Sequence, residues 1–118
     1  MSKKPVTRGY PWFDRYWREP DRIPLLVLAD GAVVGLCLIR VMDAGWTIAE
    51  FGIRPEARRQ GIGLLAVEAL ADRASAEGAR HLRADVHLWN ERARTFWRTC
   101  GFDDTAEQNG VVTTLRPL

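Results

Sequence analysis

A change of hydrophobic period at Arg54-Pro55 is the feature that most constrains how this chain folds. Before it, apolar residues form short runs of the strand type. After it, over Gly61–Glu77, they recur every three or four residues, as on one face of a helix. In a chain of 118 residues this switch predicts one α/β or α+β domain, spanning residues 1–118, in which helices pack on a sheet.

The first half of the chain predicts one short helix and three strands. The run Tyr10–Glu19 has Pro at the first helical position and aromatic residues at helical spacing, so we expect a helix that ends before Pro20. Residues 1–9 are expected to form a frayed tail. The predicted strands are Leu25–Leu28, Val33–Val41 and Trp46–Ile53.

The second half predicts two helices, one half-exposed strand and a final hairpin. Gly78 stands where glycine ends the helix that follows Gly61. Asn90 is a suitable N-cap for a second helix, which ends at Gly101. The remaining strands are His81–His87, Phe102–Gln108 and Val111–Leu115, and the hairpin turns are Asp30-Gly31 and Asn109-Gly110.

Composition and charge exclude several classes of function. A net charge of +2 creates no field that attracts nucleic acid, so no nucleic-acid partner is expected. No apolar run approaches the ~20 residues that a bilayer span needs, so we expect a cytoplasmic protein without a membrane partner. Cys37 and Cys100 lack the spacing of zinc ligands and lie in apolar patterns, which predicts two small core residues and no metal.

The loop Arg58-Arg59-Gln60-Gly61-Ile62-Gly63 lies between a strand and the first turn of the long helix. Two glycines allow close approach of a ligand, and the unpaired N–H groups of a helix start carry a partial positive charge. Two arginines add formal charge, so a pyrophosphate is the natural guest. Taken alone, the pattern favours tight strand-to-helix packing over phosphate binding.

Two segments together resemble a known family. Arg58, Gly61 and Gly63 fill the Arg-x-x-Gly-x-Gly pattern with which the GNAT superfamily of acyl-CoA-dependent N-acyltransferases binds the CoA pyrophosphate. The later run Asn90–Phe102 resembles the family's second signature, Asn-x-x-Ala-x-x-Phe-Tyr-x-x-x-Gly-Phe. The resemblance covers residues 23–118.

The resemblance implies a mixed, mostly antiparallel, splayed sheet with flanking helices. The strands that end at Ile53 and His87 would part to form a V, and the pantetheine of acetyl-CoA would hydrogen-bond there to the backbone from Phe51 to Arg54. Gly52 suits the bulge that the family has in this strand, or only a close backbone contact. The pyrophosphate would sit on Arg59 through Leu64. The implied cosubstrate-binding residues are Phe51, Gly52, Ile53, Arg58, Arg59, Gln60, Gly61, Ile62, Gly63, Leu64, Asn90 and Trp97.

The implied reaction is acetyl transfer from acetyl-CoA to the primary amine of a small molecule or peptide, by direct attack and without a covalent enzyme intermediate. An ammonium must lose a proton before it attacks, so a base is needed. Glu50 matches the family position for that base, and an exposed strand carboxylate explains it equally well. A backbone N–H near Phe51 or Gly52 would polarise the thioester carbonyl. His87 could orient the acceptor, although a solvated strand-end histidine is the simpler interpretation.

Two departures from the family pattern leave alternatives open. Trp97 stands where many relatives have a tyrosine acid, and it fits core packing better than contact with pantetheine. Only 22 residues precede the strand that the resemblance places at residues 23–29, so the family's first strand is expected to be missing, its place taken by the Tyr10–Trp17 helix or by a second subunit in a homodimer. These departures motivate a second hypothesis, a non-catalytic acyl-CoA-binding module.

Overall fold

The computed structural model describes the backbone of residues 11–118 and the side chains of residues 15–118. The tail expected at residues 1–9 lies outside the described residues. The elements in chain order are α1 (Pro11–Arg18), β1 (Arg22–Ala29), β2 (Ala32–Val41), β3 (Trp46–Ile53), a 3-10 turn (Pro55–Ala57), α2 (Ile62–Ala76), β4 (His81–His87), α3 (Glu91–Thr99), β5 (Asp103–Gln108) and β6 (Val111–Pro117).

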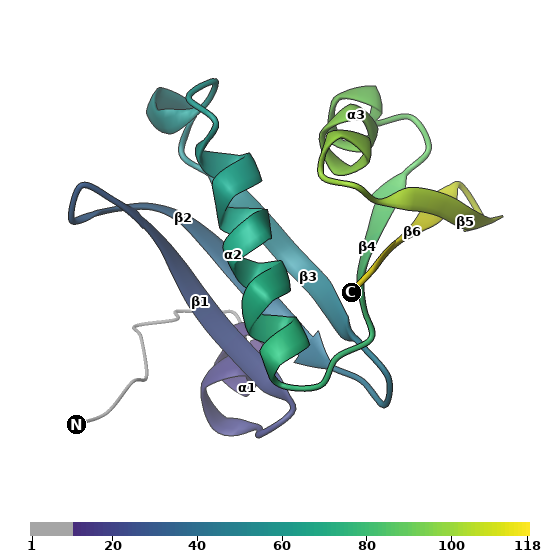
Figure 1. Cartoon of the computed structure of the whole chain (residues 1–118), viewed down its shortest axis with the longest axis horizontal. Coiled ribbons are helices and arrows are strands. Elements are labelled where there is room, and N and C mark those ends of the chain that lie inside the picture. Colours follow the sequence, from purple (N-terminus) through teal and green to yellow (C-terminus); the bar gives the residue numbers. More distant parts are fainter. Residues whose placement is uncertain (1–10) are drawn as a thin grey trace.

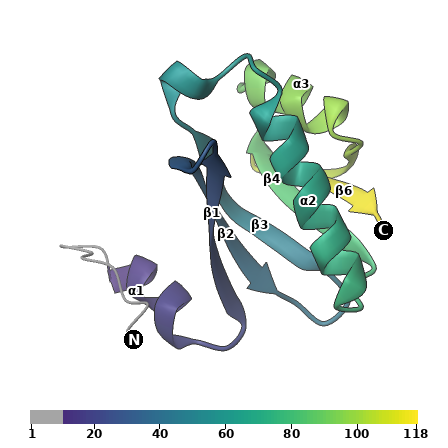
Figure 2. The same cartoon turned by 60° about the vertical axis from the view of Figure 1, so that its left-hand side comes forward.

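The strands form one mixed sheet in the order β1-β2-β3-β4-β6-β5. Only β3 and β4 pair in parallel, because α2 carries the chain back across the sheet between them. Helices α2 and α3 cover one face of the sheet and α1 lies on the other (Figures 1 and 2). The expected fold class, a mostly antiparallel sheet with flanking helices, is confirmed.

Both predicted hairpin turns have the geometry that their residues favour. Asp30 and Gly31 have φ of 52° and 81°, and Asn109 and Gly110 have φ of 53° and 77°. Two consecutive positive φ angles define a turn whose twist matches that of the flanking strands, and Asp, Asn and Gly adopt them at low cost. These turns set the register of β1 with β2 and of β5 with β6.

The main core lies between the sheet and the pair α2 and α3. The buried stripe of α2 packs on β3 and β4, and the aromatic residues of α3 close one end of this core. Its most deeply buried members are Ile39, Val67, Ala74, Leu82 and Phe102.

Helix α1 covers the opposite face of the sheet at β1. Tyr16 is only 6% exposed, and the guanidinium of Arg22 lies 5.4 Å from the centre of its ring. Burial raises the pKa of the Tyr16 hydroxyl, since burial penalises the phenolate. The aromatic residue at this position is therefore buried against the sheet. The side chains of Trp12 and Phe13, which belong to the same predicted cluster, lie outside the described residues.

Candidate functional site

An open V lies between β3 and β4. The two strands pair only from Trp46↔Leu82 to Ile48↔Ala84, and beyond these residues they have no ladder in common. Figure 1 shows them diverging towards the end of the sheet where α2 begins and α3 lies. The splayed strands that the family resemblance implies are therefore present.

A β-bulge marks the point where the strands part, but it is not at Gly52. Leu38 pairs with Glu50 and Ile39 with Ile48, so Ala49 is the extra residue, whereas Gly52 pairs regularly with Leu36. The expectation of a bulge at Gly52 is wrong. Ala49 has no positive φ, and such a bulge needs no glycine. A Cβ on Gly52 would meet nothing within 4 Å, so the close backbone contact does not require glycine at this residue; it requires it at Gly35, where a Cβ would lie 2.5 Å from the Gly52 carbonyl oxygen.

Alternate backbone groups of β3 face the V. The Arg54 N–H donates to the Val34 carbonyl at 2.7 Å, so the backbone of Arg54, and of Gly52 two residues before it, faces β2. The N–H groups of Phe51 and Ile53 therefore point towards β4. The expected continuous edge from Phe51 to Arg54 is reduced to these two residues. Because the Ile53 carbonyl already accepts a bond from Arg58 Nε at 2.8 Å, Phe51 offers the freest backbone in the V.

Two side chains of chemical interest stand at this opening. Glu50 is exposed and directly follows the bulge, on the sheet face opposite α2. His87 ends β4 and is also exposed, while Leu82, Ala84 and Val86 alternate with it into the core, so it shares the face of Glu50. The His87 ring stacks on Trp89 with 5.5 Å between ring centres.

An aromatic cluster fills the other face of the V. Phe51 stacks on Phe96, and Trp97 meets the edges of Phe51 and Phe102, with ring centres 5.0 to 5.5 Å apart. Trp97 is only 7% exposed. Its geometry is that of a core residue of α3, the interpretation that the sequence pattern favoured.

The first turn of α2 is an uncapped helix start. Gly61 is the N-cap, with φ of 76°, and none of the described side chains caps the first N–H groups. The first helical bond runs from the Leu65 N–H to the Gly61 carbonyl. The N–H groups that precede Leu65 in this turn therefore remain available to an anion, at the positive end of the helix dipole.

Glycine is favoured at positions 61 and 63 of the loop for different physical reasons. A Cβ on Gly61 would meet nothing within 4 Å, so Gly61 serves backbone conformation and leaves open space beside the helix start. A Cβ on Gly63 would lie 3.0 Å from Cε1 of Phe96, so Gly63 permits close packing of α2 against α3. Packing against another helix thus explains Gly63 and does not explain Gly61.

The polar residues of the loop differ in whether a hydrogen bond holds the side chain in place. Arg58 is tied to the end of β3 through Ile53, and Gln60 donates to the Glu56 carbonyl at 3.3 Å. Arg59 is exposed, has a positive φ of 62°, and has no hydrogen bond or ion pair with any other described residue. Its guanidinium is therefore the available charge beside the start of α2.

Asn90 is the N-cap of α3. Its Oδ1 accepts a hydrogen bond from the Ala93 N–H at 3.1 Å, as the sequence predicts for a helix start. The cap occupies the side-chain oxygen and leaves the amide NH2 without a hydrogen bond to any other described residue.

The two thiols are suited to packing rather than to catalysis. Burial raises the pKa of Cys37 to about 12 and that of Cys100 to about 11, so neither forms a thiolate at neutral pH. Among the described side chains, those of residues 15–118, no three His, Cys, Asp or Glu gather as a group able to hold a metal ion. No helix in the described part of the chain is both long and apolar enough to cross a membrane.

Comparison with known proteins identifies the family. The model of the acetyltransferase (GNAT) family matches residues 2–102, and the chain belongs to this family. Thialysine N-epsilon-acetyltransferase from Sus scrofa is 30% identical over 83 residues, which cover 66% of this chain and 49% of that protein. The chain thus spans about half the length of this curated relative.

Solved structures show the same fold. PaiA N-acetyltransferase from Thermoplasma acidophilum, in complex with coenzyme A, superposes with a TM-score of 0.79 at 17% identity, covering 88% of this chain and 65% of that one. An acetyltransferase from Thermus thermophilus has a TM-score of 0.77 at 26% identity, with coverage of 86% and 67%.

Sequence reasoning missed the bulge at Ala49, although a signal for it is present. The apolar residues of β3 that face α2 are Trp46, Ile48, Phe51 and Ile53. A spacing of two, then three, then two residues shows that the alternation is interrupted once, between Ile48 and Phe51.

Proposed function

We propose that this protein is an N-acetyltransferase that transfers the acetyl group of acetyl-CoA to a primary amine by direct attack, without a covalent enzyme intermediate. The observation that carries the proposal is the V beyond Ile48, where the Phe51 N–H points between the strands and Glu50 stands at the opening. A donor for a developing oxyanion and an acceptor for a proton are what this transfer needs.

Acetyl-CoA fits the groups that the site presents. Its pyrophosphate would bind at the Gly61–Leu64 helix start with Arg59 beside it, where uncapped N–H groups and a free guanidinium combine. Pantetheine would pair with the Phe51 and Ile53 backbone and meet the Asn90 amide. Arg58 and Gln60 would hold the loop in shape through their bonds to Ile53 and Glu56.

The residues present account for each bond and proton in the transfer. The amine nitrogen forms a bond to the thioester carbon while Glu50, directly or through water, accepts the proton that nitrogen loses. The Phe51 N–H stabilises the charge on the carbonyl oxygen, and the C–S bond then breaks to release the CoA thiolate. Trp97 has no hydroxyl to protonate that thiolate, but a thiol with a reference pKa of about 8.5 leaves as its anion near neutral pH.

Two substitutions at Gly61, by Asn and by the nearly isosteric Asp, test whether CoA binds at the start of α2. Asn and Asp both tolerate the positive φ of this position, but only Asp adds a negative charge beside the helix start. Calorimetric titration with CoA should show binding by wild type and Gly61→Asn, and at least about tenfold weaker binding by Gly61→Asp, a change of about 1.4 kcal/mol. Equal affinities in the two variants would remove the pyrophosphate from this helix.

Thiol release tests the chemical part. Acetyl-CoA is mixed with a panel of primary amines that includes thialysine, the compound in the name of the Sus scrofa relative. Amine-dependent release by wild type, with a kcat lowered about 100-fold by Glu50→Gln at unchanged acetyl-CoA affinity, is the expected result. A turnover that Glu50→Gln leaves intact would reject Glu50 as the base.

A non-catalytic acyl-CoA-binding module is the second candidate, favoured by the position of Trp97 in the core where the family signature has its tyrosine. It predicts tight binding of acetyl-CoA with no thiol release on any amine. The two candidates thus differ only in the second assay.

A further inference from the structure

Strand β1 is an exposed apolar edge of the sheet. It pairs with β2 on one side and has no strand on the other among the described residues. Leu26 and Leu28 are 57% and 61% exposed. A long apolar edge with unpaired backbone groups is a template for another strand, and proteins that leave it open usually place charges along it.

The outward backbone groups of β1 can be identified from one hydrogen bond. The Val41 N–H donates to the Asp21 carbonyl at 2.7 Å, so the backbone of Asp21 faces β2 and every second residue after it does the same. The residues between them face outward, and Pro24 is one of these, which suits a residue that has no N–H. Leu26 and Leu28 therefore present N–H and C=O groups at the edge that have no partner in the part of the chain that the structure describes.

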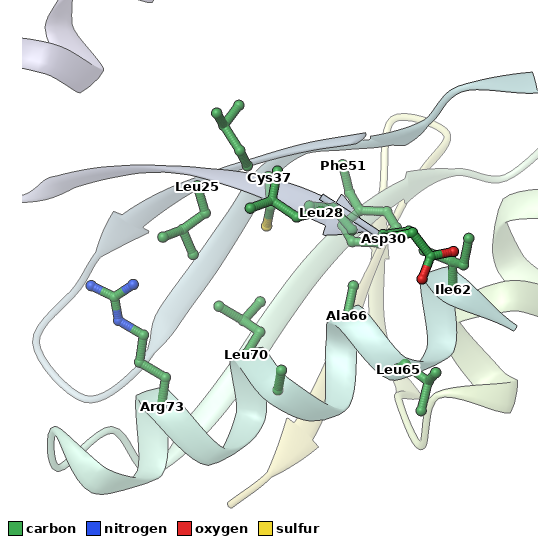
Figure 3. Close-up of a pocket in the computed structure, with 14 residues that line it drawn as sticks. Leu25, Leu28, Asp30, Cys37, Phe51, Ile62, Leu65, Ala66, Leu70 and Arg73 are labelled. Carbon is green, nitrogen blue, oxygen red and sulfur yellow. The ribbon is translucent and has the colours of Figure 1, made fainter. Parts of the chain in front are cut away.

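A groove runs beside this edge, between β1 and α2. It has a volume of about 510 Å³, and Leu25 and Leu70 point into it from opposite walls (Figure 3). Leu65 on the α2 side is 68% exposed. The apolar surface thus continues from the strand edge to the helix above it.

We propose that β1 pairs antiparallel with β1 of a second copy of this chain, about a two-fold axis at Leu26. In this register Leu26 faces itself, and its N–H and C=O groups exchange two hydrogen bonds across the axis. The Leu28 N–H donates to the Pro24 carbonyl of the other copy, which uses the outward groups that are free. Leu25 comes beside Val27 of the second copy on the face that α2 covers, and so extends the apolar wall of the groove.

Charge at the ends of the strand favours the same register. Arg22 faces Asp30 of the second copy. The Arg22 guanidinium forms two long ion pairs within its own chain, 3.8 Å to Glu19 and 3.9 Å to Asp21, while its buried Nε and Nη1 make no hydrogen bond. Asp30 is exposed and has no ion pair within the described residues. The sequence RIPLLVLAD is therefore complementary to itself when it is read antiparallel.

A second copy suits the edge better than the chain's own N-terminal segment does. Residues 1–10 include the cations Lys3, Lys4 and Arg8 and so offer an apolar edge fewer apolar side chains than a second copy of β1 does. The inference does not depend on acyl transfer, because it concerns a different edge of the sheet from the V between β3 and β4.

Opposite charges placed on the two-fold axis test the register. Full-length wild type should sediment as a dimer, whereas Leu26→Lys and Leu26→Glu should each weaken the dimer about tenfold or more, because two like charges then face each other. An equimolar mixture of the two variants should recover the dimer, since residue 26 then faces an opposite charge. Val33→Lys is the matched control, an exposed apolar residue of the same hairpin that lies on β2, away from the edge.

The results of these experiments distinguish a second copy from any other partner at the edge of β1. Far-UV circular dichroism and thermal unfolding first establish that each variant is folded. A monomeric wild type overturns the proposal and leaves the edge to residues 1–10 or to another protein. A dimer that Leu26→Lys does not weaken, or a mixture that stays monomeric, places the interface elsewhere.

Discussion

Gly63→Ala is expected to destabilise this fold, although alanine is the better helix former. The new methyl group would lie 3.0 Å from Cε1 and 3.3 Å from Cζ of Phe96. Carbon atoms pack best about 3.5–4.0 Å apart, so the Phe96 ring would have to move by about 0.5 Å. Phe51 and Trp97, with ring centres 5.5 and 4.9 Å from that of Phe96, restrict such a movement.

The expected magnitude is the difference between two opposing effects. Overpacking of this kind costs about 1–3 kcal/mol. The gain in helix propensity is at most about 1 kcal/mol, and less here because Gly63 is in the first turn. The net loss should be about 1 kcal/mol, which lowers the Tm of a domain of this size by about 4 °C.

A double-mutant cycle with Phe96→Leu isolates the contact. Urea unfolding gives the free energy of unfolding of wild type, Gly63→Ala, Phe96→Leu and the double variant. Because leucine lacks the ring edge, Gly63→Ala should be neutral or stabilising in that background, with a coupling of about 1–2 kcal/mol. Gly61→Ala is the control, expected to cost about 1–2 kcal/mol in both backgrounds because its φ is 76° and no atom lies near. Additive effects of Gly63→Ala and Phe96→Leu would refute the reasoning.

Three further outcomes follow from single contacts. Cys37 and Cys100 should not react with a disulfide reagent in the native protein at about pH 8, because burial raises their pKa to about 12 and about 11. Since these pKa values are higher in the folded than in the unfolded chain, the free energy of unfolding should fall as the pH rises past about 8.5, which denaturation midpoints measure. The hydrogen bond from Arg116 lowers the pKa of Glu68, so this pair stabilises the fold at neutral pH, and the stabilisation is lost as the pH falls through the folded pKa. Glu68→Gln should therefore flatten the acid side of the curve of unfolding free energy against pH, and an unchanged curve would contradict the pairing. Thr114→Val should lower the free energy of unfolding by about 1–2 kcal/mol, since the buried hydroxyl donates to the Ala84 carbonyl at 2.8 Å, and thermal unfolding checks this.

Most of the fold was predictable because its signals are local. The hairpin turns follow from Asp30-Gly31 and Asn109-Gly110, whose residues determine the sign of φ, and the end of α2 follows from Gly78, with φ of 91°. The 3-10 turn at Pro55–Ala57 was not predicted. Its three residues are too few for a periodic pattern to reveal.

The site was predictable only where it depends on neighbours in sequence. The loop before α2 could be placed, but the different roles of Gly61 and Gly63 could not. That difference depends on Phe96, which belongs to another helix and reaches Gly63 only through the tertiary fold. In the same way, the bond from Arg58 to the Ile53 carbonyl depends on the path of the folded loop, and no residue pattern indicates it.

The bulge at Ala49 determines what the V can do chemically. Trp46 and Ile48 face the core under α2, and with an uninterrupted period of two Glu50 would face it as well. The extra residue reverses the alternation, so that Phe51 enters the core and Glu50 faces the opposite, exposed side. It also turns the Phe51 N–H away from β2 and towards β4. One inserted residue therefore places the proposed base and the proposed oxyanion donor at the point where the parallel pairing of β3 and β4 ends.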